Sequence, residues 1–250
     1  MRARVRARAR EREREMSEVR LYRGDARILF RMLKDKSQDL ILTDPPYDIT
    51  TKDLKFKPLT NATKEIFVKN FKRVLKPSGN VVIFCGFRDK FTWHNLFKKY
   101  NFTLISEIIV VYPAGLKIRK RFLPAHESAL HFVLSEDYYF NDEVMMPDVY
   151  NTKRPRGICR NYGYDYHTAP SEKMRVTPKP LGLVQKLVEI LSPEDGEVLD
   201  CFMGTGTTAE ACVLTGRNFT GFEIDTELYK FAVERVKKAK NRMESGFHFG

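Results

Sequence analysis

Apolar and polar positions follow two patterns along the chain, one typical of buried strands and one typical of amphipathic helices. The continuous apolar run in "DLILTD" (39–44) predicts a strand covered on both faces, "VVIFCGF" (81–87) a second buried strand, and "FTLISEIIVVYP" (102–113) a third strand. Between them, "KEIFVKNFKRVLKPSGN" (64–80) and "RDKFTWHNLFKKY" (88–100) place apolar residues at helical spacing. Strands that alternate with helices in this way are typical of an α/β domain.

The same rhythm extends toward both ends of the chain. "EVRLYRGD" (18–25) predicts a strand that ends in a turn, and "ARILFRMLKD" (26–35) predicts a helix. After residue 177, "KPLGLVQKLVEIL" (179–191) is helical in pattern, and Thr226 is expected to cap a final helix. "EVLD" (197–200) and "NFTGFEID" (218–225) are strand-like. We therefore predict a doubly wound, mostly parallel α/β sheet with helices on both faces.

The rhythm is lost between residues 114 and 176, where basic residues interleave with tyrosines, prolines and glycines. We expect an insertion here, on one rim of the sheet. The chain then divides into a charged tail (1–15), a first half (16–113), the insertion (114–176), a second half (177–240) and a polar tail (241–250). Two basic clusters of the insertion could bind a polyanion, or could form a solvated face: Lys117, Arg119, Lys120 and Arg121, and Lys153, Arg154, Arg156 and Arg160.

Composition and charge narrow the class of protein. With 250 residues, 42% of them hydrophobic and 30% charged, the chain can bury a full core and has the make-up of a soluble globular protein. No apolar run approaches the ~20 residues that span a bilayer, and the four cysteines lack disulfide spacing, so we expect a cytoplasmic protein without membrane contact. The net charge of +12 favours nucleic acid as a partner. Residues 1–15 contribute +4 of it, either as a basic arm or, as we prefer, as a solvated tail.

A glycine-containing segment, "DCFMGTGTT" (200–208), lies between a predicted strand and a predicted helix. Gly204 and Gly206 let a ligand approach the backbone, and the N–H groups of the helix start can bind it, although a tight strand–helix turn would also use these glycines. Seventeen residues after Gly206, Glu223 ends the next strand, where a carboxylate can accept both hydroxyls of a ribose. The loop lacks the lysine that cradles a polyphosphate, so a nucleoside ligand without one fits better than ATP.

The segment "DPPY" (44–47) directly follows an apolar strand pattern. Proline fixes its own φ and keeps the preceding residue extended, so Asp44, Pro45, Pro46 and Tyr47 should form a rigid lip. The Asp44 carboxylate and the Pro45 carbonyl could each accept one N–H of an amine on an aromatic ring, which returns electron density to that nitrogen. Tyr47 offers a face on which the ring can stack, worth ~1–3 kcal/mol. The lip therefore suits an amine on a flat ring as acceptor.

Together, "DPPY" (44–47), "DCFMGTG" (200–206) and the preceding "TPKPLGLVQKLVEIL" (177–191) resemble the beta class of DNA amino-methyltransferases, over roughly residues 16–240 apart from the irregular middle. The order is part of the resemblance, because the catalytic motif precedes the cofactor loop in this circularly permuted class. The resemblance implies transfer of the methyl group of S-adenosylmethionine to adenine N6 in double-stranded DNA, since "DPPY" usually accompanies adenine and a serine in its first position accompanies cytosine N4. Transfer to cytosine N4 or to an RNA base, and a non-catalytic DNA-binding protein, are the alternatives.

The same resemblance assigns the functional residues. It makes 16–113 the catalytic half, 114–176 the target-recognition insertion and 177–240 the cofactor-binding half. Asp25 is expected near the adenine of the cofactor, and Thr177 and Lys179 near its methionine end; Asp200, Phe202, Gly204, Gly206, Thr207 and Glu223 complete the predicted cofactor site. His126 and Glu127 match a segment near the base pocket, whereas His131, Phe84, Phe87 and Trp93 are expected to be structural. No histidine spacing indicates a metal, and a homodimer and a cognate restriction endonuclease stay open.

Overall fold

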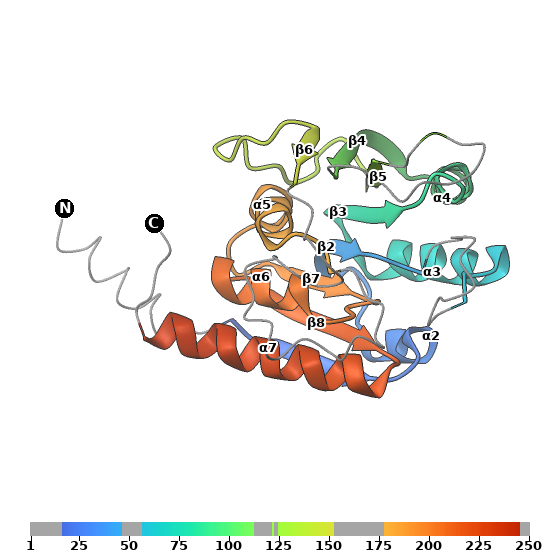
Figure 1. The fold of residues 1–250 in the computed structure, drawn as a ribbon. Helices are drawn as coiled ribbons and strands as arrows, with labels where there is room; N and C mark the ends of the chain where they lie inside the picture. The colour runs from blue at the N-terminus through green and yellow to red at the C-terminus, as the bar shows by residue number, and fades with distance from the viewer. Residues whose placement is uncertain (1–16, 47–56, 113–121, 123–124, 153–177, 246–250) are drawn as a thin grey trace.

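The computed structural model describes residues 17–46, 57–112, 122, 125–152 and 178–245, and they build one mixed sheet with helices on both sides (Figure 1). The strands are β1 (Val19–Arg23), β2 (Gln38–Thr43), β3 (Leu75–Cys85), β4 (Thr103–Val111), β5 (His126–Val133), β6 (Val149–Asn151), β7 (Glu197–Asp200) and β8 (Asn218–Glu223). The helices are α2 (Ala26–Leu29) with the 3-10 turn η1 (Phe30–Met32), α3 (Asn61–Val74), α4 (Lys90–Lys99), α5 (Leu181–Leu191), α6 (Thr207–Thr215) and α7 (Thr226–Glu244).

The sheet has the strand order β1-β8-β7-β2-β3-β5-β4-β6. Neighbours from β1 to β3 all pair in parallel, whereas β5 is antiparallel to both β3 and β4. This arrangement confirms the prediction of a doubly wound, mostly parallel α/β sheet. Because β2 and β7 are adjacent but far apart in sequence, the segments that follow them meet at one edge of the sheet.

Side chains of β2 alternate between two hydrophobic layers, as the two-residue period of a strand requires. Leu40 and Leu42 belong to the cluster that also contains the apolar faces of α5, α6 and α7. Ile41 belongs to the opposite cluster, which is rich in phenylalanine and covers the other face with α3 and α4. Both clusters exclude water from β2, which explains the unbroken apolar run in its sequence.

The boundaries of the expected insertion are wrong at two places. β5 lies inside the sheet between β3 and β4, and β6 extends the sheet at its edge, although both fall within residues 114–176. The sequence "SALHFVL" (128–134) is strand-like, but the irregular sequence on either side of it led us to assign it to the insertion. The basic clusters of the insertion lie outside the described residues.

Three smaller expectations also need correction. Asp225, not Thr226, caps α7, and its carboxylate accepts the N–H groups of Glu227 and Leu228. Helix α7 continues to Glu244, beyond the predicted start of a tail at residue 241. Phe87 is 80% exposed, whereas Phe84 and Trp93 are buried as expected. The remaining tail residues, 1–16 and 246–250, lie outside the described ranges.

Candidate active site

Four acidic side chains gather where the parallel strands end. Because carboxyl ends of parallel strands lie at the same edge of a sheet, Asp44 after β2, Asp200 at the end of β7, and Glu223 at the end of β8 approach one another. Asp25 joins them from the end of β1, since the N–H of the preceding Gly24 donates to the carbonyl of Glu223 at 2.8 Å. This edge therefore unites residues from both halves of the chain.

The loop from β7 to α6 is held in a tight turn by its own backbone. Met203 N–H donates to the carbonyl of Phe222 (3.0 Å) and Gly206 N–H to that of Met203 (2.8 Å). Gly204 and Gly206 have φ of +52° and +81°, a region that disfavours side chains. The space around them differs: a Cβ on Gly206 would lie 2.9 Å from Ala232 Cβ, whereas near Gly204 the nearest heavy atom would be 3.9 Å away. Packing against α7 requires Gly206, and an open surface lies over Gly204.

Glu223 fixes this loop from the neighbouring strand. Its two carboxylate oxygens accept Gly204 N–H (2.9 Å) and Asp225 N–H (2.7 Å), and only 7% of the residue is exposed. Burial raises the pKa of Glu223, although the backbone hydrogen bonds oppose that shift. The predicted ribose-binding carboxylate therefore lies next to the open glycine and is already oriented by the chain.

Asp200 links three elements beneath the loop. Its carboxylate accepts Thr43 Oγ1–H (2.8 Å), Thr208 Oγ1–H (2.7 Å) and Phe202 N–H (3.0 Å). Burial raises the pKa of Asp200 to about 7, with these hydrogen bonds acting in the opposite direction. Asp200 was predicted to bind the cofactor, and its placement gives it a further role, which is to join β2, β7 and α6.

Other predicted cofactor residues lie in the loop or on the elements next to it. Phe202 is half-buried and its ring centroid lies 4.7 Å from that of Phe67. Thr207 begins α6, and its hydroxyl accepts a hydrogen bond from Arg235 at 2.7 Å. Asp25 caps α2 and pairs with Arg27, whose side-chain hydrogen bond is the main cause that lowers the pKa of Asp25. Thr177 lies outside the described residues.

Arg235 is a buried residue of α7 that contacts the loop and that sequence reasoning missed. Its guanidinium pairs with Glu210 (2.7 Å) and donates to the carbonyl and hydroxyl of Thr205 (3.3 and 3.0 Å). Arginine is almost never fully buried unless paired, and here the pair connects α7 to α6 under the glycine turn. Arg235 lies on the buried stripe of α7, three residues after Ala232 and four before Ala239, so helical periodicity could have identified it as inward-facing.

The "DPPY" segment leaves β2 directly beside the loop. Asp44 is half-buried, Pro45 is buried, and Tyr47 lies outside the described residues. Asp44 Oδ2 lies 2.9 Å from Nζ of Lys179, which also lies 3.0 Å from Oε2 of Glu127 on β5. Lys179 was expected at the methionine end of a cofactor, and its ammonium pairs with the candidate catalytic carboxylate.

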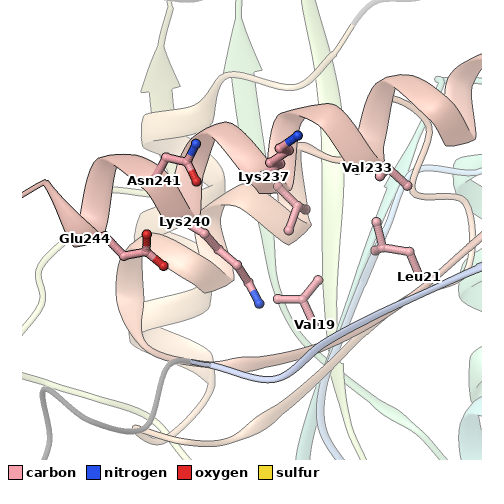
Figure 2. A pocket seen from close by; sticks show the side chains of 8 residues that line it. Val19, Leu21, Val233, Lys237, Lys240, Asn241 and Glu244 are labelled. Carbon is pink, nitrogen blue, oxygen red and sulfur yellow. The ribbon is translucent and has the colours of Figure 1, made fainter.

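A groove elsewhere on the protein has no connection to this edge. It has a volume of about 410 Å³ and lies between β1 and the second half of α7, lined by Val19, Leu21, Val236 and Lys240 among others (Figure 2). Within the described ranges, no three histidine, cysteine, aspartate or glutamate side chains gather as a metal site would require, and no helix is long and apolar enough to cross a membrane.

At this edge the protein can hold two flat, polar groups side by side. The exposed backbone of Gly204, the carboxylate of Glu223 and the half-buried ring of Phe202 suit a nucleoside. The Asp44 carboxylate and the Pro45 carbonyl are hydrogen-bond acceptors only, so they suit an amine. A carboxylate that is paired with a lysine is a poor nucleophile, which favours transfer between the two bound groups over covalent catalysis by Asp44.

Comparisons with known proteins agree with this geometry. A family model described as DNA methylase, for N6 and N4 enzymes, matches residues 38–234. The type II methyltransferase M.BglII of Bacillus subtilis is 28% identical over 86% of this chain and 68% of its own length. The DNA adenine methyltransferase YhdJ of Escherichia coli K12 is 26% identical over 88% of this chain and 83% of its own.

Solved structures show the same fold. The M1.HpyAVI–SAM complex superimposes with a TM-score of 0.65 at 26% identity, and the match covers 87% of this chain and 99% of that one. PvuII DNA methyltransferase, which is cytosine-N4-specific, gives a TM-score of 0.72 at 18% identity over 93% of this chain and 94% of its own. At that identity the second match concerns the fold alone.

Proposed function

Since this chain belongs to the DNA methylase family of N6 and N4 enzymes, we propose that it transfers the methyl group of S-adenosylmethionine to the exocyclic N6 of adenine in double-stranded DNA. One observation carries the proposal: the Asp44–Pro45 acceptors and the Glu223–Gly204 nucleoside site lie at the same edge of the sheet, where β2 and β8 end on either side of β7. A methyl donor and an amine acceptor can therefore meet without any covalent step on the protein.

The residues of the loop fit S-adenosylmethionine. The open backbone at Gly204 allows close approach, and Glu223 would accept the ribose hydroxyls with lone pairs that its two backbone donors leave over. Asp25 and Phe202 would contact the adenine, and Asp200, Gly206 and Thr207 hold the loop in shape. When bound, the cofactor supplies an electrophilic methyl group on a sulfonium. Burial keeps water from the loop carboxylates and so strengthens their hydrogen bonds.

The acceptor amine is activated by geometry rather than by a strong base. Asp44 accepts one N–H and the Pro45 carbonyl accepts the other, so the nitrogen lone pair is freed from the ring and can attack the methyl carbon. Tyr47 stacks on a base that has been flipped out of the duplex. Once the cofactor has supplied its methyl group, the nitrogen would carry a surplus proton, and the Asp44 carboxylate would accept it.

Adenine is favoured over cytosine by the residue at position 44. This position is an aspartate, whereas the cytosine-N4 enzymes of the beta class usually have a serine there. In addition, one of the relatives is a DNA adenine methyltransferase. The basic clusters Lys117–Arg121 and Lys153–Arg160 would contact phosphates on either side of the target base.

The experiment is an analysis of nucleosides after incubation with labelled cofactor on duplex DNA and, separately, on RNA. We expect label in N6-methyladenine from DNA. Label in N4-methylcytosine would correct the acceptor, and label in RNA would correct the substrate. If the protein binds the cofactor but transfers no methyl group, it has the methyltransferase fold and is not catalytically active.

A further inference from the structure

The ammonium of Lys179 lies between two carboxylates that come from different parts of the sheet. Lys179 precedes α5, and its Nζ is 2.9 Å from Asp44 Oδ2 and 3.0 Å from Glu127 Oε2. The ring of Phe84 lies beneath it, with the centroid 4.9 Å from Nζ. The hydroxyl of Tyr112 donates to Oε1 of Glu127 and so fixes the second carboxylate. Three chain segments therefore converge on one buried cation.

Burial strengthens the ion pairs of Lys179. Only 9% of the Lys179 side chain is exposed, against 30% for Asp44 and 15% for Glu127. Burial alone lowers the pKa of Lys179, yet the charges of Asp44 and Glu127 outweigh it and raise that pKa above its ordinary range. The two carboxylates therefore favour the charged form of Lys179, and its low-dielectric surroundings strengthen its interaction with Asp44.

We propose that Lys179 is a positioning residue for Asp44: its ammonium fixes one carboxylate oxygen and keeps the carboxylate ionised, while Glu127 anchors the ammonium. The inference rests on the proposed function of Asp44 as the acceptor of the amine N–H. An ionised, immobile carboxylate accepts a hydrogen bond along one direction, whereas a protonated one would present a donor to the amine. Lys179 thus selects the form of Asp44 that activates the target nitrogen.

The charges around Asp44 show why one cation matters. Lys179 is a cation paired with it, and Glu127 lies on the far side of that ammonium. Burial is the main cause that raises the pKa values of Asp200 and of the Cys85 thiol, and the charge of Asp44 adds to both shifts. Without Lys179, Asp44 and Glu127 would be two carboxylates sharing a site, and like charges disfavour ionisation.

Lys179→Met tests the proposal, because methionine keeps the length of the side chain and removes the charge. The matched control is Lys76→Met. Nζ of Lys76 lies 2.8 Å from Oδ2 of Asp39, which is at the start of β2, the end opposite to Asp44. The Lys76→Met variant therefore also loses a lysine–aspartate pair, but away from the active site. Titration of the Asp44 carboxyl by carbon NMR, assigned with Asp44→Asn, needs neither cofactor nor DNA. Single-turnover methyl transfer and calorimetry with S-adenosylmethionine complete the set.

We expect Asp44 to titrate at higher pH in Lys179→Met than in the wild type and in Lys76→Met. Single-turnover transfer should fall ~100-fold, the scale of a small misplacement of a reacting group, and cofactor affinity should stay at the wild-type value. The double variant Lys179→Met/Glu127→Gln should move the titration of Asp44 back toward wild type, yet leave transfer slow because the carboxylate is no longer fixed.

Two outcomes overturn the inference. If Asp44 titrates as in the wild type, Lys179 does not control its ionisation. If cofactor affinity falls while transfer at saturating cofactor is normal, Lys179 serves the cofactor instead. Failure of the proposed function looks different: the wild type would transfer no methyl group to DNA, while the titration of Asp44 would still shift in Lys179→Met.

Discussion

Gly206→Ala should destabilise the fold far more than the same change at the other end of the same helix. Gly206 and Gly216 flank α6, and their φ values of +81° and +70° both cost an alanine ~1–2 kcal/mol. Only Gly206 is confined: its added Cβ would lie 2.9 Å from Ala232 Cβ and 3.1 Å from Ala232 Cα, whereas Gly216 has no heavy atom within 4 Å. Overpacking of this kind costs a further ~1–3 kcal/mol. Gly216→Ala is therefore the matched control.

Urea unfolding of both variants measures the difference directly. We expect a loss of ~2–5 kcal/mol in the free energy of unfolding for Gly206→Ala, the sum of the two costs, and of ~1–2 kcal/mol for Gly216→Ala. Removing the opposing methyl with Ala232→Gly should recover most of the excess, once the effect of that change alone is subtracted. Equal losses in both glycine variants would mean that α7 does not press on the loop, and would refute the packing argument.

Gly204→Ala extends the series from stability to binding. Its φ of +52° carries the same backbone cost, but the nearest heavy atom to an added Cβ lies 3.9 Å away, so stability should match that of Gly216→Ala. A ligand that approaches the open backbone would meet the new methyl group. Affinity for S-adenosylmethionine, measured by calorimetry, should therefore fall by ~1–3 kcal/mol. Wild-type affinity would place the cofactor away from Gly204.

Three further predictions address separate parts of the account. Glu223→Ala should weaken cofactor binding by ~1.5–3 kcal/mol, the scale of hydrogen bonds to a charged group. If calorimetry of this variant gave the wild-type affinity, Glu223 would not be a cofactor-binding residue. Burial lowers the pKa of His131 to about 4. As pH falls from ~6.5 toward 4, the histidine of the unfolded chain takes up a proton before that of the folded protein, so the free energy of unfolding decreases by up to ~3 kcal/mol. Because Asp200 has the opposite effect, the measurement is the difference in the free energy of unfolding between wild type and His131→Gln across this range. Replacing Lys120 and Arg121 with alanine should flatten the slope of log DNA affinity against log salt by up to about two units, and an unchanged slope would mean that these residues form a solvated face.

The buried parallel strands could be predicted from the sequence because a strand covered on both faces has little freedom in composition. β2 places all six residues in the interior, and its apolar run is unmistakable. The glycine loop was equally legible, since the positive φ at Gly204 and Gly206 restricts the residues allowed there. Local rules of this kind fix the position of the loop and of the strand that carries Asp44.

Contacts between distant segments could not be predicted in the same way. Lys179 binds Asp44 and Glu127 because β2 and β5 flank β3 in the sheet, and no local pattern encodes that neighbourhood. His131 was expected to be structural, and its Nε2 indeed bonds Asn80 Oδ1 at 2.8 Å inside the sheet. The apolar stripe of α7 includes position 235, so periodicity indicates that Arg235 faces inward, but it does not indicate the partners Glu210 and Thr205.

The central claim is that Asp44 directs a methyl group to adenine N6 in DNA, and one measurement tests it most directly. The protein and its Asp44→Ala variant are expressed in a host that lacks adenine methylation, and the host DNA is then sequenced by a method that detects modified bases. The account predicts N6-methyladenine within a defined sequence context for the wild type and none for Asp44→Ala, with both proteins folded and equal in cofactor affinity. N4-methylcytosine in the wild-type DNA, or undiminished N6-methyladenine in the variant, would contradict it.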